Sequence, residues 1–234
     1  MTTSLRIGGW VPMSTVDYPD HLACVLFCQG CPWRCHYCHN PHLWAPDASP
    51  LYPWEAIESF LLKRQGLLDA VVFSGGEATL QHGLAEAMFR VKALGYHIGL
   101  HTAGIRPSAL ARALELVDWV GFDIKALPES CATITGISNS GSVNWRSLEI
   151  LLSRGIAYEC RTTVLWNLFD LEHLRQLVHK LHAYGVQCYA VQIARPQGMK
   201  KSDRHHLGTP ATSAMDDLWI ECRSLIPDFK VRLS

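Results

Sequence analysis

The sequence lacks the features that would assign it to a membrane, to nucleic acid or to the secretory pathway. No apolar run approaches the roughly 18 residues that a membrane-spanning helix needs. Lysine plus arginine number 21 and aspartate plus glutamate also number 21, so no basic surface for nucleic acid is indicated. Residues 1–10 show no signal-peptide pattern. We therefore expect a cytoplasmic protein with no membrane or nucleic-acid partner.

Linkers, low-complexity tracts and sequence repeats are also missing. A chain of 234 residues is long enough to bury a sizeable core, and we expect one domain spanning residues 1–234. Its nine cysteines are an odd number, which argues against a complete disulfide framework and favours a reducing compartment. Five cysteines lie in or near apolar runs, as small buried residues usually do: Cys24, Cys131, Cys160, Cys188 and Cys222.

What the sequence does have is a regular alternation of strand and helix patterns. Strands are predicted over 22–28, 70–74, 97–102, 119–125, 158–165 and 188–193. Helices are predicted over 54–65, 84–94, 108–116, 145–153, 171–184 and 213–225, with a short run at 230–233. Six such units imply a parallel sheet with right-handed crossovers, short of the eight of a closed barrel. The expected fold is α/β, a partial, open (β/α)6 TIM-like barrel.

Three cysteines stand together directly after the first predicted strand. Cys31, Cys35 and Cys38 are spaced C-x3-C-x2-C in a loop short enough for all three sulfurs to face one metal centre. Cysteine thiolates hold iron–sulfur clusters, and three of them leave one iron of a four-iron cluster without a protein ligand. A structural zinc site with His36, His39 or His42 as fourth ligand is an alternative, as is a disulfide.

Polar residues and glycines mark the ends of the next predicted strands. They are Ser74-Gly75-Gly76-Glu77, His101-Thr102-Ala103-Gly104, Asp123-Ile124-Lys125 and Arg161-Thr162-Thr163. Functional groups of parallel α/β folds gather at the carboxyl ends of strands, so we predict roles for Asp123, Lys125 and Arg161. Purely structural roles remain open for Lys125, as partner of a surface acid, and for Thr162, as a strand residue.

The cysteine spacing, followed one β/α unit later by Gly-Gly-Glu, resembles the signature of the radical S-adenosylmethionine (SAM) superfamily. This resemblance implies one 4Fe–4S cluster on Cys31, Cys35 and Cys38, and SAM bound at the free iron. It also implies that Gly75, Gly76 and Glu77 hold the methionine amino group.

A longer stretch narrows the resemblance. Ile7-Gly8-Gly9-Trp10-Val11-Pro12, Ser14 to Pro19 and Cys38-His39-Asn40-Pro41 resemble the activating enzymes of glycyl radical enzymes, most closely the anaerobic ribonucleoside-triphosphate reductase activating proteins. By this resemblance the adenine lies near Tyr37, with His39 and Asn40 closing that side. The ribose and carboxylate region is lined by Thr102, Asp123 and Lys125, and Arg161 joins the cofactor-binding residues.

The mechanism that the resemblance implies needs no acid, base or nucleophile from this chain. Flavodoxin or ferredoxin donates an electron, SAM is cleaved to methionine and a 5′-deoxyadenosyl radical, and the radical takes a hydrogen from a glycine of the partner. The implied partner is a glycyl radical enzyme, foremost anaerobic ribonucleotide reductase. Activating enzymes with a ferredoxin-like insertion carry further cysteine sets, and this chain has none. One cluster is therefore expected.

The chain departs from these relatives at two positions. Activating enzymes of pyruvate formate-lyase commonly have an aspartate that helps bind a monovalent cation where this chain has His101, and a ring nitrogen is a poor ligand for a hard cation. Relatives also read Gly-Pro-Gly where this chain has Tyr18-Pro19-Asp20, near the expected protein substrate. Farther along, the polar stretch Arg195–Thr212 fits a rim or lid as well as an ordinary surface loop.

Three other functions remain open. One is a small-molecule radical SAM enzyme such as a 7-carboxy-7-deazaguanine synthase-like protein, which turnover of a pterin would reveal. Another is an activating enzyme for a different glycyl radical enzyme, which co-purification would identify. The third is a zinc-stapled α/β binding module, which predicts a colourless protein with stoichiometric zinc.

Overall fold

The computed structural model describes residues 5–49, 52–166, 168–194 and 211–232. Its strands form one eight-stranded sheet in the order β1-β2-β3-β4-β5-β6-β7-β8. The strands are β1 (Ile7–Ser14), β2 (Ala23–Cys28), β3 (Ala70–Gly75), β4 (His97–Thr102), β5 (Trp119–Asp123), β6 (Ala157–Val164), β7 (Cys188–Ile193) and β8 (Asp228–Arg232). Neighbours from β2 to β8 are parallel, and β1 pairs with β2 in the antiparallel direction.

The predicted open parallel α/β sheet is confirmed, with an additional strand at each edge. The six predicted strands correspond to β2–β7. The first edge strand, β1, was not predicted, because it contains two glycines and a proline that are unfavourable in strands. At the other edge, the short run predicted at 230–233 overlaps β8, which joins the sheet beside β7.

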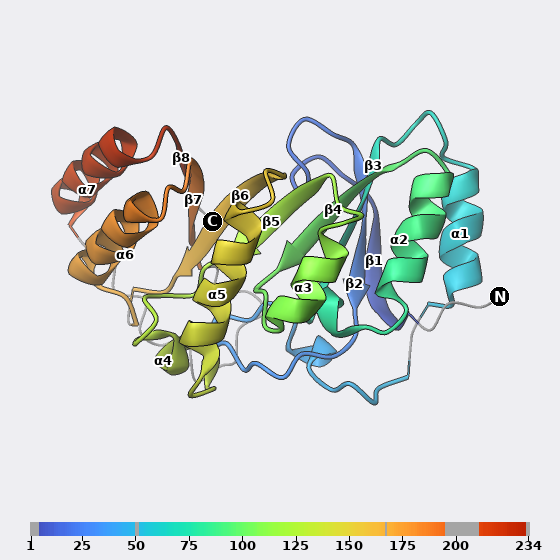
Figure 1. Cartoon of the computed structure of the whole chain (residues 1–234), viewed down its shortest axis with the longest axis horizontal. Coiled ribbons are helices and arrows are strands. Elements are labelled where there is room, and N and C mark those ends of the chain that lie inside the picture. The colour runs from blue at the N-terminus through green and yellow to red at the C-terminus, as the bar shows by residue number, and fades with distance from the viewer. Residues whose placement is uncertain (1–4, 50–51, 167, 195–210, 233–234) are drawn as a thin grey trace.

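Helices cover the outer face of the curved sheet, with α1 and α2 over one end and α6 and α7 over the other (Figure 1). They are α1 (Trp54–Leu62), α2 (Leu84–Ala93), α3 (Pro107–Ala113), α4 (Cys131–Thr135), α5 (Ser140–Leu152), α6 (Leu171–Ala183) and α7 (Thr212–Leu225), with 3-10 turns η1 (Pro41–Leu43) and η2 (Ala78–Leu80). Short α4 was not predicted, since five residues give no helical period. No helix among the described residues is long and apolar enough to cross a membrane.

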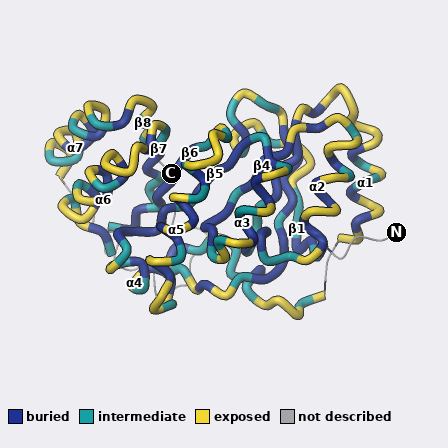
Figure 2. The backbone as a smooth tube through the Cα atoms, viewed as in Figure 1, coloured by how far each residue is buried: buried dark blue, intermediate teal, exposed yellow. Residues whose placement is uncertain are grey.

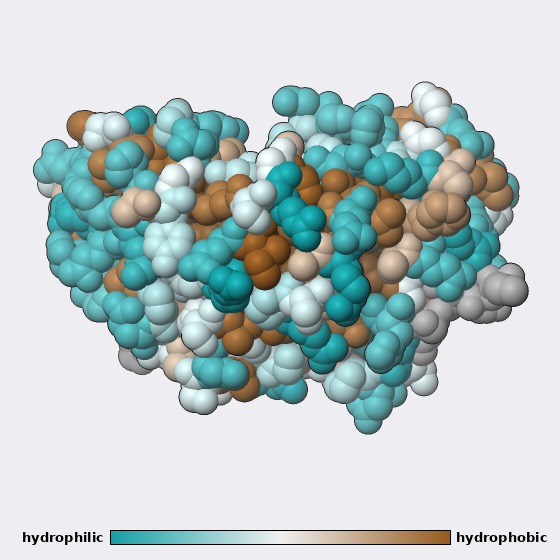
Figure 3. Space-filling view, in the orientation of Figure 1, coloured by the Kyte–Doolittle hydropathy of each residue, from teal (hydrophilic) through white to brown (hydrophobic). Residues whose placement is uncertain are grey.

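Two apolar clusters lie on the two faces of the sheet. Between sheet and helices lies the larger one, with Leu26, Phe73, Leu100 and Phe122 fully buried. A smaller cluster on the concave face joins Val25 and Val72 to Tyr18 and Trp119. Figure 2 shows buried strands next to helices whose outward surfaces are exposed, and Figure 3 shows that this outer face is mostly hydrophilic with apolar patches between. In the part of the chain that the structure describes, helices thus cover one face of the sheet only.

The parallel strands end together, and this places their following loops along one edge. Register pairs Ala23 with Ala70 and Cys28 with Gly75, so β2 and β3 stop at the same level. The long loop after β2 runs along this carboxyl edge of the sheet, at the bottom of Figure 1. Most of the stretch Arg195–Thr212, for which a rim or lid was considered, lies outside the described residues.

Candidate cofactor-binding site

One pocket at the carboxyl edge of β2–β7 brings together every predicted site residue except Arg161. Its cavity volume is about 210 Å³. From the cysteine loop come Cys31, Cys35, Tyr37, Cys38, His39 and Asn40, and from the strand ends Gly75, Gly76, Glu77, Thr102, Asp123 and Lys125. Further lining residues were not predicted as site residues: Trp33, Trp44, Ser74, His101, Ala103, Ile105, Thr163 and Gln192. The alternation of strand side chains could have indicated Thr163, which shares a face with Arg161.

The Gly-Gly-Glu segment holds the cysteine loop by its backbone. The amide of Gly76 donates to the carbonyl of Cys28 at 2.8 Å, and that of Glu77 donates to the carbonyl of Gly30 at 2.9 Å. A Cβ at Gly75 would lie 2.2 Å from the Cys28 nitrogen, and one at Gly76 2.4 Å from the Gly30 oxygen. Gly75 also has φ +108°, a conformation that favours glycine. Both glycines therefore allow the cysteine loop to pack directly against the end of β3.

The unpredicted helix α4 anchors the middle of the same loop. The amide of Arg34 donates to the carbonyl of Thr135 at 2.9 Å, and that of His36 donates to the carbonyl of Ile134 at 3.2 Å. Farther along, the buried side-chain amide of Gln29 donates to the carbonyls of His42 and Ala45. The loop after β2 is therefore held by hydrogen bonds from Gln29 at its start to Ala45, and η1 is its one helical turn among the described residues.

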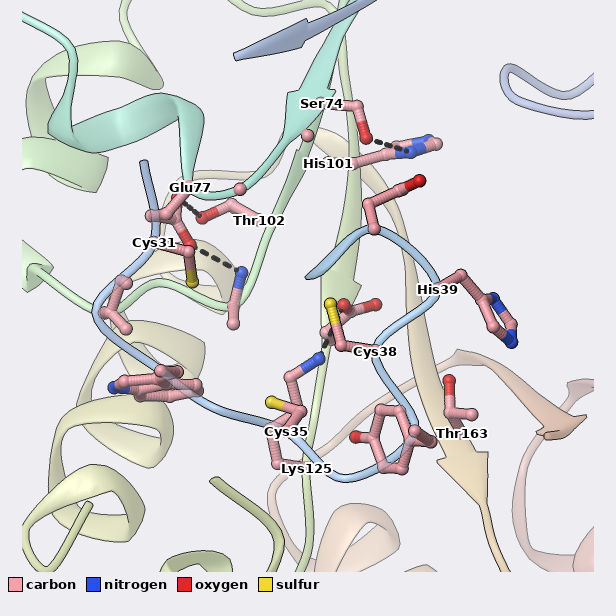
Figure 4. A pocket seen from close by; sticks show the side chains of 18 of the residues that line it. Cys31, Cys35, Cys38, His39, Ser74, Glu77, His101, Thr102, Lys125 and Thr163 are labelled. Carbon is pink, nitrogen blue, oxygen red and sulfur yellow. Dashed lines mark hydrogen bonds and ion pairs between the residues drawn. The ribbon is translucent and has the colours of Figure 1, made fainter. Parts of the chain in front are cut away.

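The three thiols stand around the pocket. Figure 4 shows the sulfurs of Cys35 and Cys38 near the amine of Lys125, with Cys31 across from them beside Glu77 and Thr102. Within the described ranges, no three His, Cys, Asp or Glu side chains are arranged to hold a single metal ion. Cysteine thiolates are the ligands of iron–sulfur clusters, and all three of these cysteines line one pocket, so the chemistry of the donor set suits such a cluster. Burial raises the pKa of Cys31 to about 12, with a further contribution from Glu77, so its thiolate needs a compensating positive charge.

The Glu77 carboxylate is buried and joins the ends of β3 and β4. Its Oε1 accepts from the hydroxyls of Thr102 at 2.5 Å and Thr79 at 2.6 Å, and its Oε2 accepts from the amide of Ala103 at 3.1 Å. Burial raises the pKa of Glu77, and these hydrogen bonds oppose that rise. Glu77 therefore fixes the pocket wall, and Oε2 keeps capacity for a further donor.

An ion pair lies on the opposite wall, where Lys125 Nζ is 2.8 Å from Asp123 Oδ2. Burial acts to lower the pKa of Lys125, but the attraction of Asp123 outweighs it and the net pKa is raised well above the usual value. The same Nζ lies 5.5 Å from the ring centroid of Tyr37. The buried Tyr37 hydroxyl has no hydrogen-bond partner among the described residues, and a polar group of a bound ligand would supply one.

Asn144 of α5 holds two strand ends and was missed in the sequence. Its side-chain nitrogen donates to the carbonyls of Ala103 at 2.8 Å and Asp123 at 2.9 Å, and its oxygen accepts from the amide of Lys125 at 3.2 Å. Beside it, the hydroxyl of Ser147 donates to the carbonyl of Gly104 at 2.5 Å. A polar residue on a helix is unremarkable in sequence, so no local pattern could have indicated this role.

Arg161 lies deeper on the concave face, outside the pocket lining among the described residues. Its Nε donates to Glu159 at 2.7 Å and its guanidinium carbon lies 5.0 Å from the Trp119 ring. Next to it, His101 Nε2 lies 2.8 Å from the carbonyl oxygen of Asp17 and 3.2 Å from Arg161 Nη1. Burial and the nearby Arg161 lower the pKa of His101 to about 4, so the imidazole is neutral at pH 7.

The second departure from the relatives, at Tyr18-Pro19-Asp20, contains a left-handed backbone conformation. Asp20 is the only non-glycine residue with positive φ in the described part of the chain, at 61°. Aspartate tolerates this left-handed region better than most residues. The chain can therefore make here the kind of turn for which glycine is the usual residue. Thr162 serves structure, as considered, because its hydroxyl donates to the carbonyl of Ile124.

Comparison with known proteins identifies relatives over most of the chain. Residues 25–181 match the radical SAM superfamily. A Methanocaldococcus jannaschii protein, provisionally described as a glycyl-radical enzyme activating enzyme, is 25% identical over 235 residues, or 97% of this chain and 95% of that protein. The pyruvate formate-lyase-activating enzyme of Clostridium pasteurianum is 31% identical over 181 residues, or 74% of this chain and 75% of that enzyme.

Solved structures support the fold. SuiB of Streptococcus suis, bound to S-adenosylmethionine, has a TM-score of 0.64 at 12% identity over 88% of this chain. The present chain spans about half of SuiB, 48% of its length. A domain of a pyruvate-formate lyase-activating enzyme from Bacteroides vulgatus has a TM-score of 0.53 at 16% identity, covering 71% of this chain and 99% of that domain.

Proposed function

The chain belongs to the radical SAM superfamily and, within it, to the activating enzymes of glycyl radical enzymes, and from this premise we propose that it activates an anaerobic ribonucleoside-triphosphate reductase. Enzymes of this family use a 4Fe–4S cluster and SAM. The chain would act as a single radical SAM domain in the cytoplasm. The assignment of the partner rests on residues 7–19 and on the sequence around the cysteine loop.

The observation that carries the proposal is the direct packing of the cysteine loop on the Gly-Gly-Glu segment. The amides of Gly76 and Glu77 donate to the carbonyls of Cys28 and Gly30, and these bonds hold the start of the cysteine loop against the end of β3. A site for SAM at the free iron needs a cluster and a methionine-binding segment within one small pocket. The two motifs meet here because parallel strands β2 and β3 end at the same level.

The cysteine loop and the Gly-Gly-Glu segment would bind different groups. Cys31, Cys35 and Cys38 would hold the cluster, which supplies the electron that cleaves SAM into methionine and a 5′-deoxyadenosyl radical. Gly75, Gly76 and Glu77 would bind the methionine amino group, for which Glu77 Oε2 keeps an acceptor site.

The opposite wall would bind the rest of SAM. The raised pKa of Lys125 keeps its amine charged, which suits a carboxylate; Asp123 on this wall and Thr102 beside Glu77 offer oxygens to ribose. The unpartnered hydroxyl of buried Tyr37 would receive a polar group near the adenine, beside His39 and Asn40. We retain Arg161 as a residue that supports the site from below this wall: its Nη1 lies 3.2 Å from His101 Nε2, and its charge helps to lower the pKa of Asp123.

Anaerobic reconstitution with iron and sulfide, followed by dithionite and SAM, tests the activity. We expect 5′-deoxyadenosine in the wild-type protein and none in Cys35→Ala, with Cys188→Ala, a cysteine outside the pocket, as the matched control. Formation of a glycyl radical on anaerobic ribonucleotide reductase, and not on pyruvate formate-lyase, would identify the partner by electron paramagnetic resonance. Uptake of stoichiometric zinc with intact SAM would refute the proposal.

A further inference from the structure

A second depression lies behind the cysteine loop. Its cavity volume is about 670 Å³. Cys31 and Trp44 line both this depression and the candidate SAM pocket, so the loop forms the wall between them. Whatever occupies the second depression therefore lies next to the first cluster cysteine without entering the SAM pocket.

The depression is basic. Arg6, Arg34, Arg106 and His82 line it, and none of its lining residues is an aspartate or glutamate. An adjoining depression shares Arg106 and His82 and adds Arg112, again with no acidic residue in its lining. We call this pair of depressions the basic groove. The chain has equal numbers of acidic and basic residues, yet the charged residues lining this groove beside the cysteine loop are all basic.

The arginines of the basic groove divide into two kinds. Arg34 donates to the carbonyls of Cys31 at 2.5 Å and Trp33 at 2.9 Å, and its guanidinium carbon lies 5.1 Å from the Trp44 ring. Arg6 donates to the carbonyl of Ala48. These two bind the loop itself. Arg106 is exposed, and in the part of the chain that the structure describes no acid neutralises its guanidinium or that of Arg112.

We infer that the basic groove docks an acidic one-electron carrier protein whose redox group is exposed, and that the electron enters through the Cys31 side of the loop. This inference rests on the proposed function, which consumes one electron for each SAM. The carrier is oxidised by one electron. The electron then cleaves the sulfur–C5′ bond of SAM. Of the three electrons (the bond pair and the incoming one), two stay on the methionine sulfur and one on C5′. The resulting 5′-deoxyadenosyl radical takes a hydrogen atom from the glycine of the partner.

Geometry favours the electron carrier over the glycyl radical partner as occupant. The glycine of that partner must reach SAM, whose pocket is lined by strand ends on the other side of Cys31. An electron needs only to reach the cluster, and Cys31, a predicted cluster ligand, lines both the SAM pocket and the basic groove. With the carrier in the basic groove, both proteins can bind at once. Like-signed arginines also steer an acidic protein, raising association rates by about 10- to 1,000-fold at low salt.

The test measures binding of purified flavodoxin to the cluster-loaded protein at 0.05 and 0.5 M NaCl. We expect Arg106→Glu/Arg112→Glu to weaken the affinity about tenfold or more at the lower salt, and much less at the higher, because salt screens exposed charges. Arg106→Gln/Arg112→Gln should fall between. The matched control is Arg64→Glu/Arg154→Glu, the same charge change on exposed arginines outside the basic groove.

Measuring SAM cleavage with two different reductants distinguishes a failure of this inference from a failure of the proposed function. With dithionite, which needs no docking surface, the Arg106→Glu/Arg112→Glu protein should form 5′-deoxyadenosine at the wild-type rate, and with flavodoxin hydroquinone at least tenfold more slowly. Unchanged flavodoxin affinity, or equal weakening in the control variant, would overturn the inference. So would a loss of affinity for the glycyl radical partner in place of flavodoxin. Absence of cleavage by the wild-type protein with dithionite would instead contradict the proposed function, and the binding measurement would still decide on the groove.

Discussion

The two faces of the sheet differ in what the alternate side chains of the same strands do. Toward the helices, β2–β5 present Leu26, Phe73, Leu100 and Phe122, all fully buried in one apolar cluster. Toward the concave face, β3 and β5 begin with apolar side chains and end with Ser74 and Asp123, and β4 carries His101 near its end. Side chains that alternate along the same strands thus form the apolar core on one face and line the pocket at the carboxyl end of the other face.

The concave face beyond the pocket is held by charge. Glu159 is 1% exposed and accepts from Arg161 Nε and from both terminal nitrogens of Arg232, each at 2.7 Å. This network ties β8 to β6 across β7. Buried charges of this kind add little net stability when complete, but leaving one unpaired is costly. Apolar contacts and paired charges therefore stabilise the two faces in different ways, and substitutions can separate them.

The largest effect is expected on the helix side. Phe73→Ala should lower the free energy of unfolding by about 4 kcal/mol, because it removes a ring from the packed core. Phe89→Ala, the same change at a residue that is 67% exposed, should cost under about 0.5 kcal/mol. Urea unfolding measures both. Similar losses in the two variants would contradict the assignment of stability to this face.

Next comes the charge network of the concave face. Glu159→Gln should lower the free energy of unfolding by about 3 kcal/mol at pH 7, since the buried Arg161 guanidinium loses the carboxylate to which it is bonded. Loss of Arg232 should matter less, because 36% of its side chain is exposed and water can screen the charge. Chemical denaturation of the two variants side by side gives the comparison.

The pH dependence of that loss checks its electrostatic origin. Burial acts to raise the pKa of Glu159, but Arg161 and Arg232 outweigh it and the net pKa is lowered. A lowered folded pKa means that the stabilisation is complete above the unfolded value of about 4.3 and disappears as the pH falls through the folded value. The difference between wild-type and Glu159→Gln proteins should therefore shrink in acid. A constant difference from pH 7 to pH 3 would point to lost packing instead.

A smaller effect is expected where the helix face supports the site. Asn144→Ala should cost about 2 kcal/mol by leaving buried backbone groups at the ends of β4 and β5 unsatisfied. It should also weaken SAM binding, measured by calorimetry, because Asp123 and Lys125 lose their common anchor. Asn139→Ala, at an exposed position of the same helix start whose side chain makes no capping bond, is the matched control. Unchanged SAM affinity in Asn144→Ala would show that the strand ends do not need this anchor.

The smallest effect lies on the outer surface of the helices. Arg146→Ala removes an ion pair with Glu149 at 3.0 Å, but 68% of the arginine side chain is exposed. Such pairs contribute about 0–1 kcal/mol, so we expect a change below about 0.5 kcal/mol in urea unfolding. A loss comparable with that of Glu159→Gln would contradict the distinction between buried and exposed charge.

The strands and most of the helices that cover the sheet could be predicted from the sequence, because apolar periodicity and glycines at helix ends are local signals. The glycines that follow four helices have positive φ, as helix ends require: Gly66, Gly95, Gly155 and Gly185. The pocket was predictable for a similar reason, since Cys31, Gly76 and Lys125 each follow a strand and parallel strands end at one edge.

The rest depended on contacts between distant segments. Asn144 acts on strand ends about 20 to 40 residues away, and no spacing in the sequence encodes that. The strand end suggested a cofactor contact for Arg161, but Glu159 and Trp119 hold its side chain below the pocket. Strand β1 was missed because local propensity opposes it, whereas its pairing with β2 supplies the hydrogen bonds that override propensity.

The central claim is that the cysteine loop and the strand ends form one site for a cluster and SAM. Electron paramagnetic resonance of the reduced, reconstituted protein tests it most directly, with spectra recorded before and after addition of SAM. We predict a 4Fe–4S signal whose g-values shift when SAM binds at the free iron, and a smaller shift in Lys125→Met, which loses the charged amine of the opposite wall. A cluster signal that SAM leaves unchanged would contradict the claim.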